Sequence, residues 1–388
     1  PDDVLKPLVT KYFQYGYSDV QIVQCVLEDV DAAKNGWTLG KHTVRRRRLS
    51  WGLLGTRQQS HTIDTIAQHV KAIRYERDDK PPGVKRTQDW LRSTLNLRVP
   101  RQLVAEYNRL YHQEEVRQRK GHRLKRKNFW TAGVFDVFCF DQHDKWGDKY
   151  GLWLHTGVEA FSGAILYINV WFTNSNPRLI FRYYLQAVRN YGGIPLLTQS
   201  DWGSENNGIA NGHSFLHRLL DPSLVGTLQH QWKPGHTNIK PEGKWSQMRR
   251  EFSPGYERLF QEGVSAGLCH QEDPLDKYLF RRLAVPFLQR KLDEYVHMYN
   301  SSRPRADKNK VLPVGIPNDI LEHPARYGAK NFKIHVSKDE LCTVEDIYAP
   351  SDHPVFELVP PTFETEYQRV YRQLGSPKLA KSNFWPVY

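Results

Sequence analysis

Three carboxylic acids in the middle of the chain have the surroundings that a metal-dependent phosphoryl-transfer site requires. Asp201 follows the short apolar segment 194–197 and precedes Gly203, so we expect it at the end of a strand, before a sharp turn. Asp141 ends an earlier apolar segment, and Glu242 lies where a later helix begins. Carboxylates from three separate elements can converge on one site, so Asp141, Asp201 and Glu242 are the predicted catalytic residues.

The same three acids are the predicted ligands of two divalent cations, Mg²⁺ or Mn²⁺. Mg²⁺ prefers oxygen ligands and leaves much of its coordination shell to water and phosphate. A pair of such ions can activate an attacking oxygen and stabilise the leaving oxygen of an in-line displacement. One aspartate after a strand is more often a turn former or a helix cap. The prediction therefore depends on all three acids occurring in this order.

The segments that carry these acids resemble the DDE integrase and transposase superfamily, and they look closest to the eukaryotic integrase core domain proteins. The resemblance covers residues 130–323 and is carried by FDQHDKW at Asp141, HTGVEAFSGAILYINVW, SDWGSEN at Asp201, and the N-x-x-x-E-x-x-W pattern of Asn238, Glu242 and Trp245. It implies a ribonuclease H-like α/β core, with a mixed five-stranded sheet flanked by helices, in a recombinase that cleaves DNA ends and transfers strands. A domesticated, catalytically silent DNA-binding protein is the alternative, and a nuclease acting on RNA–DNA hybrids is a third possibility.

Two departures from the family pattern concern Glu242. Pro241 stands where relatives usually carry an aliphatic residue, but proline is compatible with the start of a helix, so Glu242 is still expected in the first turn. The interval between Asp201 and Glu242 is longer than in the retroviral enzymes. This length predicts an inserted loop around residues 226–235.

The apolar pattern predicts all-α DNA-binding modules followed by the α/β core. The predicted parts are a helix-turn-helix module over 1–60, a second helical module over 61–115, a basic linker over 116–129, the catalytic core over 130–325 and an extension over 326–388. Within the core we expect strands over 134–141, 153–158, 164–171 and 195–200, a helix over 178–191, and a helix that Glu242 opens. For the extension, dimerisation, DNA contact and packing on the core are all open.

The charge distribution predicts a nucleic-acid partner and places its contacts in the first third of the chain. Residues 1–130 contain 26 Lys and Arg against 14 Asp and Glu, whereas the other 258 residues contain 29 against 28. Nearly all of the formal net charge of +13 therefore lies in the first segment. Such a concentration of positive charge attracts phosphate, and binding through it depends strongly on salt. A solvated basic tail is the alternative, but the basic residues fall within patterned segments.

The first module is predicted to be a helix-turn-helix that binds double-stranded DNA. Ser18 is a candidate N-cap, and Val20, Val23 and Leu27 mark the apolar face of the helix that follows, with Ile22 and Val26 flanking it. A second helix can pack inward through Val44. The side chains expected to face DNA are Lys41, His42, Arg45, Arg46 and Arg48. An ordinary helical pair with a charged face is the alternative.

The second module repeats this arrangement with a weaker pattern. Residues 62–73 form a predicted helix, and 86–111 resembles another helix-turn-helix, whose last helix presents Arg101 and Gln102 outward. The linker that follows has no apolar periodicity, so we expect it to lie along the phosphate backbone. Its expected DNA contacts are Arg117, Arg119, Lys120, Arg123, Lys125, Arg126 and Lys127. The same run could also be a nuclear localisation signal.

Several polar residues near the acids have weaker claims to a role in the site. Possible contacts with metal or phosphate are Asp136, His143, Asp144 and Glu205, although a turn or a cap is the commoner role for such residues. Residues expected in turns or at DNA are Asn206 and Asn238. On the predicted Glu242 helix, Lys244, Arg249 and Arg250 are expected to hold phosphate.

Cysteine usage and hydropathy restrict the remaining function classes. The four cysteines, at 25, 139, 269 and 342, have no metal-ligand spacing, so no zinc is expected. Few cysteines in a basic chain fit a reducing, nuclear compartment, and no apolar run approaches membrane-spanning length. Since Pro1 has no preceding Met, we expect a trimmed chain. Amphipathic helices over 276–300 and 362–374 offer surfaces for a homodimer or a larger assembly, unless both only cover the core.

Overall fold

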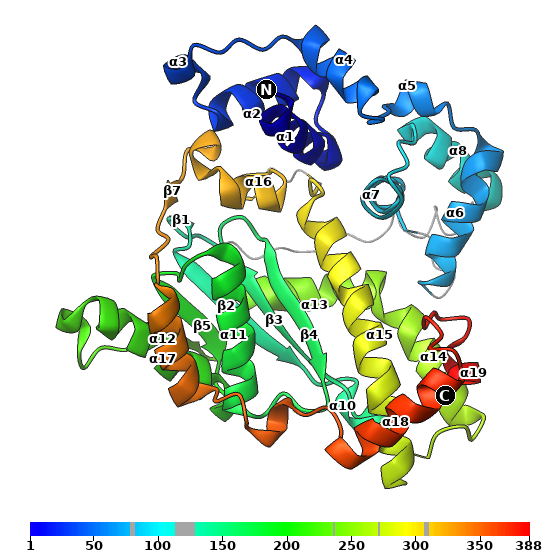
Figure 1. Cartoon of the computed structure of the whole chain (residues 1–388), viewed down its shortest axis with the longest axis vertical. Helices are drawn as coiled ribbons and strands as arrows, with labels where there is room; N and C mark the ends of the chain where they lie inside the picture. Colours follow the sequence, from blue (N-terminus) through cyan, green and yellow to red (C-terminus); the bar gives the residue numbers. More distant parts are fainter. Residues whose placement is uncertain (78–81, 113–128, 236, 271, 306–309) are drawn as a thin grey trace. The chain divides into compact units, whose positions relative to one another are not determined.

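The computed structural model describes the chain except for residues 78–81, 113–128, 236, 271 and 306–309 (Figure 1). The chain divides into two compact units. The first comprises Pro1–Lys125 with Ser301–Pro304, and the second comprises Arg126–Asn300 with Arg305–Tyr388. Every strand of the described residues belongs to the second unit. Within the described ranges, none of the helices has the length and apolarity that crossing a bilayer requires.

The first unit begins with three helices that pack on one another. They are α1 (Asp2–Tyr15), α2 (Asp19–Asp29) and α4 (Lys41–Ser50), with the short α3 (Ala32–Asn35) before α4. Ser18 caps α2 as predicted, because its hydroxyl accepts from the Gln21 backbone N–H while the Gln21 side chain accepts from the Ser18 backbone. The predicted inward position of Val20 is wrong: both α1 and α4 contact α2, and they bury Ile22 and Val26 while Val20 is exposed.

Three further helices form a second core in the first unit. They are α6 (Ile63–Tyr75), α7 (Val84–Leu95) and α8 (Arg101–Tyr111), preceded by the short α5 (Thr56–Gln59). Their buried residues include Ile66, Val70, Leu91, Val104 and Tyr107. Arg92 of α7 donates to the Tyr15 carbonyl at 3.0 Å, and Arg98 donates to the Phe13 carbonyl. These bonds join the two helical groups within one compact unit.

The second unit is built on a mixed five-stranded sheet (Figure 1). Its strands are β2 (Val137–His143), β3 (Trp153–Glu159), β4 (Ile165–Trp171), β5 (Leu197–Asp201) and β6 (His230–Lys233), in the spatial order β4-β3-β2-β5-β6. β3 is antiparallel to β2 and β4, whereas β2, β5 and β6 run parallel. β2 is therefore central, and its apolar residues Phe138, Cys139 and Phe140 are fully buried, as the continuous apolar run before Asp141 requires.

Helices cover the sheet and one of its edges. α11 (Pro177–Tyr191) and α12 (Asn207–Leu220) pack together, and Tyr184 of α11 contacts Phe140 of β2. α13 (Ile239–Glu251) lies against β2 and β3. α15 (Pro274–Asn300) covers the edge of β4. There the Asn300 amide bonds to both backbone groups of Ile165, and the Gln289 amide bonds to the Ile168 carbonyl and the Val170 N–H. These bonds satisfy strand groups that would otherwise be open to pairing with another chain.

The residues after 326 pack into the second unit. β7 (Lys330–Asn331) pairs in parallel with β1 (Gly133–Val134), and α17 (Lys338–Tyr348) packs on α11 and α12. α18 (Pro361–Gln373) is tied to α15 by the Arg282–Glu364 ion pair at 2.6 Å, and α19 (Phe384–Val387) places Phe384 against Phe287. Residues 326–388 therefore pack on the core, which is one of the three roles left open for them; dimerisation and DNA contact stay predictions.

The observed strands agree with the predicted positions, but the pattern does not predict β6 and α12. β6 lies within the segment expected as an inserted loop, because its four residues are too few and too polar to show strand periodicity. The helix predicted over 276–300 is α15, and it buries its apolar face, including Leu283, Leu288 and Leu292, so that face offers no surface for assembly. The remaining elements of the described chain are α10 (Gly147–Tyr150), α14 (Ser253–Ser265), α16 (Pro317–Glu322), and the 3₁₀ turns η1 (Ser204–Asn206), η2 (Pro222–Leu224), η3 (Pro324–Tyr327) and η4 (Pro354–Phe356).

Candidate active site and nucleic-acid surfaces

Asp141 and Asp201 lie at the same edge of the sheet, on neighbouring parallel strands. The pairing of β2 with β5 ends at Phe140 and Ser200, and each acid is the next residue of its strand. Neighbouring strands are about 4.8 Å apart, and residues at equivalent positions point to the same face. On the other side of β5, Asp201 pairs with Lys233 of β6. The strand register therefore brings two of the three predicted acids together, with a lysine beside them.

Glu242 comes from the first turn of α13, as predicted. The residue before this helix is Asn238, whose fully buried side chain donates to the Phe140 carbonyl at 2.7 Å and accepts from Gln199 Nε2 at 3.0 Å. Phe140 and Gln199 lie on β2 and β5, close to the strand ends that carry the other acids. Asn238 thus fixes the start of the Glu242 helix to both strands. Its burial excludes the contact with DNA that the sequence left open.

The three carboxylates are close enough for their charges to act on one another. Burial, followed by the charges of Asp201 and Glu242, raises the pKa of Asp141 from an ordinary 3.8 to about 8. Hydrogen bonding to the Gln142 backbone N–H and to Trp245 offsets only part of this rise in pKa. A positive ion between the acids would relieve the repulsion that the fold creates.

A divalent cation fits this donor set. All three side chains offer carboxylate oxygens, which suit Mg²⁺ and Mn²⁺ better than they suit softer metals. Among the residues that the structure describes, no group of three or more His, Cys, Asp and Glu side chains already has the arrangement of a metal centre. The fold therefore brings the acids to one edge of the sheet without closing their side chains into a ligand cage.

Two of the weaker candidates are carboxylates with structural partners. Asp136 precedes β2 and accepts from the Thr131 hydroxyl and a backbone N–H, so it caps the turn at the opposite end of that strand from Asp141. Asp144 is exposed and accepts from Asn174 Nδ2 at 2.6 Å. Both observations agree with the commoner role of aspartate in turns and caps.

The other weak candidates are buried around the two strand ends. His143 stacks on the Trp245 ring at 5.0 Å, and burial, followed by the charges of Lys145 and Arg249, lowers its pKa to about 4. Past β5, the side chains of Glu205 and Asn206 are buried and bond to each other at 2.9 Å. The Asn206 amide also donates to the carbonyl of Asp201 at 3.4 Å. This pair shapes the turn that follows the acid, and its burial excludes a contact of Asn206 with DNA.

The basic residues of α13 are the half-buried Lys240, the buried Lys244 and two exposed arginines. The structure contradicts the predicted contact of Lys244 with phosphate. This side chain is only 9% exposed, and its ammonium group donates to the Gly163 carbonyl at 2.7 Å. Arg249 and Arg250 are exposed. Arg249 lies two helical turns after Glu242 on the same face of the helix, and its charge acts on His143, two residues past Asp141. Of the two exposed arginines, Arg249 is therefore the one that borders the acids.

In the first unit, most of the α4 residues predicted to face DNA are exposed. They are Lys41, His42, Arg45 and Arg46. The expectation for Arg48 is corrected: this side chain is 5% exposed, its Nε donates to Asp19 at 3.0 Å, and its guanidinium group lies 4.8 Å from the centre of the Phe13 ring. Arg48 therefore holds α4 to α2 and α1 and is not presented to a ligand.

The other predicted DNA contacts lie on α8 and in the basic linker. Arg101 and Gln102 are exposed at the start of α8, in agreement with their predicted outward direction. The linker residues lie outside the described part of the chain, and their role remains a prediction. They are Arg117, Arg119, Lys120, Arg123, Lys125, Arg126 and Lys127.

β6 adds residues to this edge of the sheet that the sequence did not identify. Lys233 stands opposite Asp201 in the register of β6 with β5, and the Trp232 ring stacks on the ring of Trp202. The only signal in the sequence is that each tryptophan stands beside a charged residue, Asp201 or Lys233. That signal has no structural meaning until 230–233 is recognised as a strand next to β5.

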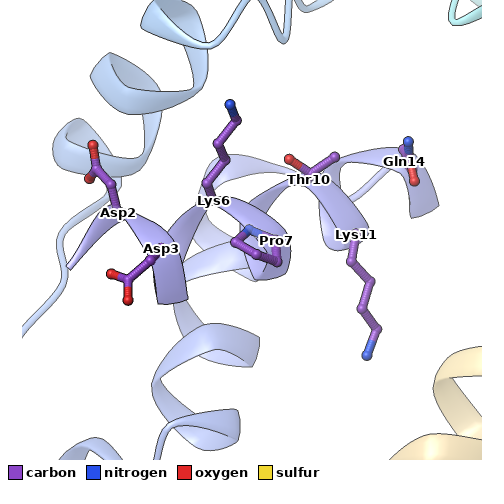
Figure 2. A pocket seen from close by; sticks show the side chains of 7 residues that line it. All are labelled: Asp2, Asp3, Lys6, Pro7, Thr10, Lys11 and Gln14. Carbon is purple, nitrogen blue, oxygen red and sulfur yellow. The ribbon is translucent and has the colours of Figure 1, made fainter.

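A pocket of the first unit is lined by a single helix. Figure 2 shows its lining side chains on α1, which are Asp2, Asp3, Lys6, Pro7, Thr10, Lys11 and Gln14. Both signs of charge occur along this surface, and no other element contributes a group to it. Since groups from separate elements do not converge there, the pocket lacks the arrangement that makes the three acids a candidate site.

Comparison with known families agrees with this geometry. The model of a family described as integrase core domain matches residues 104–321, which is more than half of the chain and includes all three acids. The match confirms the predicted ribonuclease H-like α/β core. No curated protein matches the chain.

Proposed function

We propose that this chain, which belongs to the integrase core domain family, is a metal-dependent recombinase that cleaves DNA ends and transfers DNA strands. The observation that carries the proposal is the strand register: Asp141 and Asp201 end neighbouring parallel strands, and the buried Asn238 joins the start of the Glu242 helix to both of those strands. Acids from β2, β5 and α13 thus converge at one edge of the sheet. An oxygen-donor site on an integrase fold suits chemistry at phosphorus.

Asp141, Asp201 and Glu242 would hold the two divalent cations, Mg²⁺ or Mn²⁺. Such ions, when bound, supply Lewis-acid activation of the attacking oxygen and stabilise the leaving oxygen. The side chains around the acids would position the DNA. Lys233 lies beside Asp201 in the sheet, and Arg249 follows Glu242 on the same face of α13, so both offer positive charge to a phosphate bordering the carboxylates.

Exposed residues of the first unit would supply most of the affinity for double-stranded DNA. On α4 they are Lys41, His42, Arg45 and Arg46, and on α8 they are Arg101 and Gln102. A helix-turn-helix protein places such a helix in the major groove, and contacts with phosphate make the binding salt-dependent. Since one site acts on one strand at a time, coordinated joining of two DNA ends would require at least a dimer.

Cleavage of end-labelled duplex DNA tests the proposal. The full chain is incubated with a pool of duplex ends in Mg²⁺, in Mn²⁺ and in EDTA, and the products are separated on denaturing gels. We expect cleavage only with a divalent ion, and Asp201→Asn should abolish it, because this change removes a ligand shared by the ion pair. Asp148→Asn, at an exposed position in α10, is the matched control and should cleave like the unaltered protein.

The binding of the same duplexes separates the possible outcomes. Asp201→Asn should bind DNA almost as well as the unaltered chain, since the basic surfaces are untouched. Binding by the unaltered chain without ion-dependent cleavage would identify instead a DNA-binding protein that keeps the integrase fold. Cleavage by Asp201→Asn at the unaltered rate would refute the assignment of the site.

A further inference from the structure

Two stacked tryptophans, Trp202 and Trp232, lie at the ends of β5 and β6, next to Asp201. Trp202 is the residue directly after Asp201, and 71% of its surface is exposed. Its ring is nearly parallel to that of Trp232, with an interplanar angle of 18° and a distance of 5.6 Å between the ring centroids. In the register of β5 with β6, Trp232 stands opposite Ser200, and Lys233 stands opposite Asp201. An aromatic surface and a lysine therefore both border the second acid of the candidate site.

Trp232, the member of the pair that lies on β6, is supported by the buried His230. The Trp232 ring meets the ring of His230 edge to face at 4.4 Å. His230 is buried, and its two ring nitrogens are hydrogen-bonded to the hydroxyls of Thr198 at 2.9 Å and Ser200 at 3.1 Å. Strand pairing fixes the backbone of Trp232, the two bonds hold the His230 ring against the Trp232 ring, and Trp232 in turn supports Trp202. The exposed indole is thus part of a preformed flat surface.

The tryptophan pair and the acid lie on different faces of the sheet. Successive residues of a strand point to opposite faces, so Trp232 lies on the face opposite to the one shared by Asp201 and Lys233. If the phosphate of a nucleotide lies at the acids, its base must therefore pass the end of β5 to reach the tryptophan pair on the other face. An unpaired base can reach this surface by leaving its helix, whereas a base held in a duplex stays stacked on its neighbours.

We propose that Trp202 and Trp232 form a stacking platform for an unpaired base of the DNA strand that occupies the carboxylate site. This inference rests on the proposed function, because it assigns the ligand from the strand that the acids would act on. Every base has a flat π-face, so stacking on an indole tolerates any sequence, and it is a recurrent way of holding single-stranded nucleic acid. Lys233 adds positive charge for the backbone of the same strand. The platform would hold the end of the strand open at the point of reaction.

Binding of duplexes with paired and unpaired ends tests the platform. The full chain with Asp201→Asn, which blocks cleavage, is titrated with a blunt duplex and with the same duplex carrying a short unpaired end that contains 2-aminopurine. We expect tighter binding of the unpaired end and quenching of 2-aminopurine fluorescence on an indole. Adding Trp202→Ala should reduce affinity for the unpaired end by roughly 5- to 140-fold, the equivalent of losing one stacked base. Affinity for the blunt duplex should stay unchanged.

Two matched variants complete the test. Trp130→Ala removes an equally exposed indole, also 71% exposed, from another part of the second unit and should leave the preference for unpaired ends intact. Trp202→Phe keeps an aromatic face and should restore part of the preference. Circular dichroism confirms that each variant is folded.

The outcomes separate this inference from the function on which it rests. Failure of the chain to bind any duplex would overturn both proposals. Duplex binding with equal affinity for blunt and unpaired ends, or a preference that Trp202→Ala leaves intact, would overturn only the platform. A change in molar mass by light scattering in Trp202→Ala, with the preference intact, would assign the pair to a contact between proteins and would also overturn the platform.

Discussion

Asp141 and Asp201 occupy equivalent positions on two neighbouring parallel strands, each one residue past the paired residues Phe140 and Ser200. This register places two carboxyl groups side by side on one face of the sheet. With burial as the larger cause, the Asp201 charge then raises the pKa of Asp141. The same geometry that would bind cations thus creates a repulsion, which a proton relieves when no metal is bound.

In the absence of metal, Asp141 should make the protein less stable as pH rises. The pKa of about 8 in the folded protein exceeds the ordinary 3.8, so the folded state holds a proton that the unfolded chain releases. This contribution to the free energy of unfolding is fully present below about pH 4 and is lost as pH rises through about 8. It amounts to at most about 6 kcal/mol, because each unit of pKa shift corresponds to about 1.4 kcal/mol. Urea unfolding in EDTA across this range measures it. Asp141→Asn should flatten the dependence, Asp148→Asn should not, and an unchanged slope in Asp141→Asn would contradict the assignment.

Mg²⁺ should stabilise the protein more strongly at high pH than at low pH. A carboxyl group must lose its proton before it can ligate a metal, so binding should strengthen as pH approaches about 8, the pKa of Asp141. Thermal melts with and without Mg²⁺, at pH 6 and pH 8.5, measure the shift in Tm that the ion produces. We expect the larger shift at pH 8.5, and its loss in Asp201→Asn. Equal shifts at the two pH values would place the bound ions elsewhere.

Asn238→Ala should impair catalysis by displacing Glu242, although Asn238 itself cannot reach a substrate. The change removes both hydrogen bonds of a fully buried amide and leaves the Phe140 carbonyl without this donor, at a cost of about 1–3 kcal/mol in the free energy of unfolding. Because the start of α13 is no longer fixed, cleavage should require more Mg²⁺ even at temperatures where the variant is folded. Asn207→Ala, at an exposed position in α12, is the control. An unaltered Mg²⁺ requirement in folded Asn238→Ala would reduce its role to stability alone.

The parts of the second unit that could be predicted carry local signals. The apolar run before Asp141 marks a central strand, and Glu242 falls in a first turn whose proline is compatible with a helix. β6 could not be predicted, since its four residues become a strand only by pairing with β5. The burial of Arg48 and Lys244 could not be predicted either. Their partners, such as Asp19 for Arg48, lie far away in the sequence. The residues next to a basic side chain therefore do not show whether it is buried or exposed.

The four consecutive arginines of α4 should separate into residues that bind DNA and a residue that supports the fold. Arg45 and Arg46 are exposed, so replacing both with Ala should leave the free energy of unfolding unchanged. It should also lower the slope of log K against log salt by about 0.9 for each DNA phosphate that the protein no longer neutralises. Arg48→Ala should act in the opposite way, because it removes the buried partner of Asp19 and costs about 3 kcal/mol of stability. Fluorescence anisotropy over a range of salt concentrations, with urea unfolding of the same variants, checks both outcomes. If the double variant binds with an unchanged slope, α4 does not contact the DNA backbone through these arginines, and the interface must lie elsewhere in the chain.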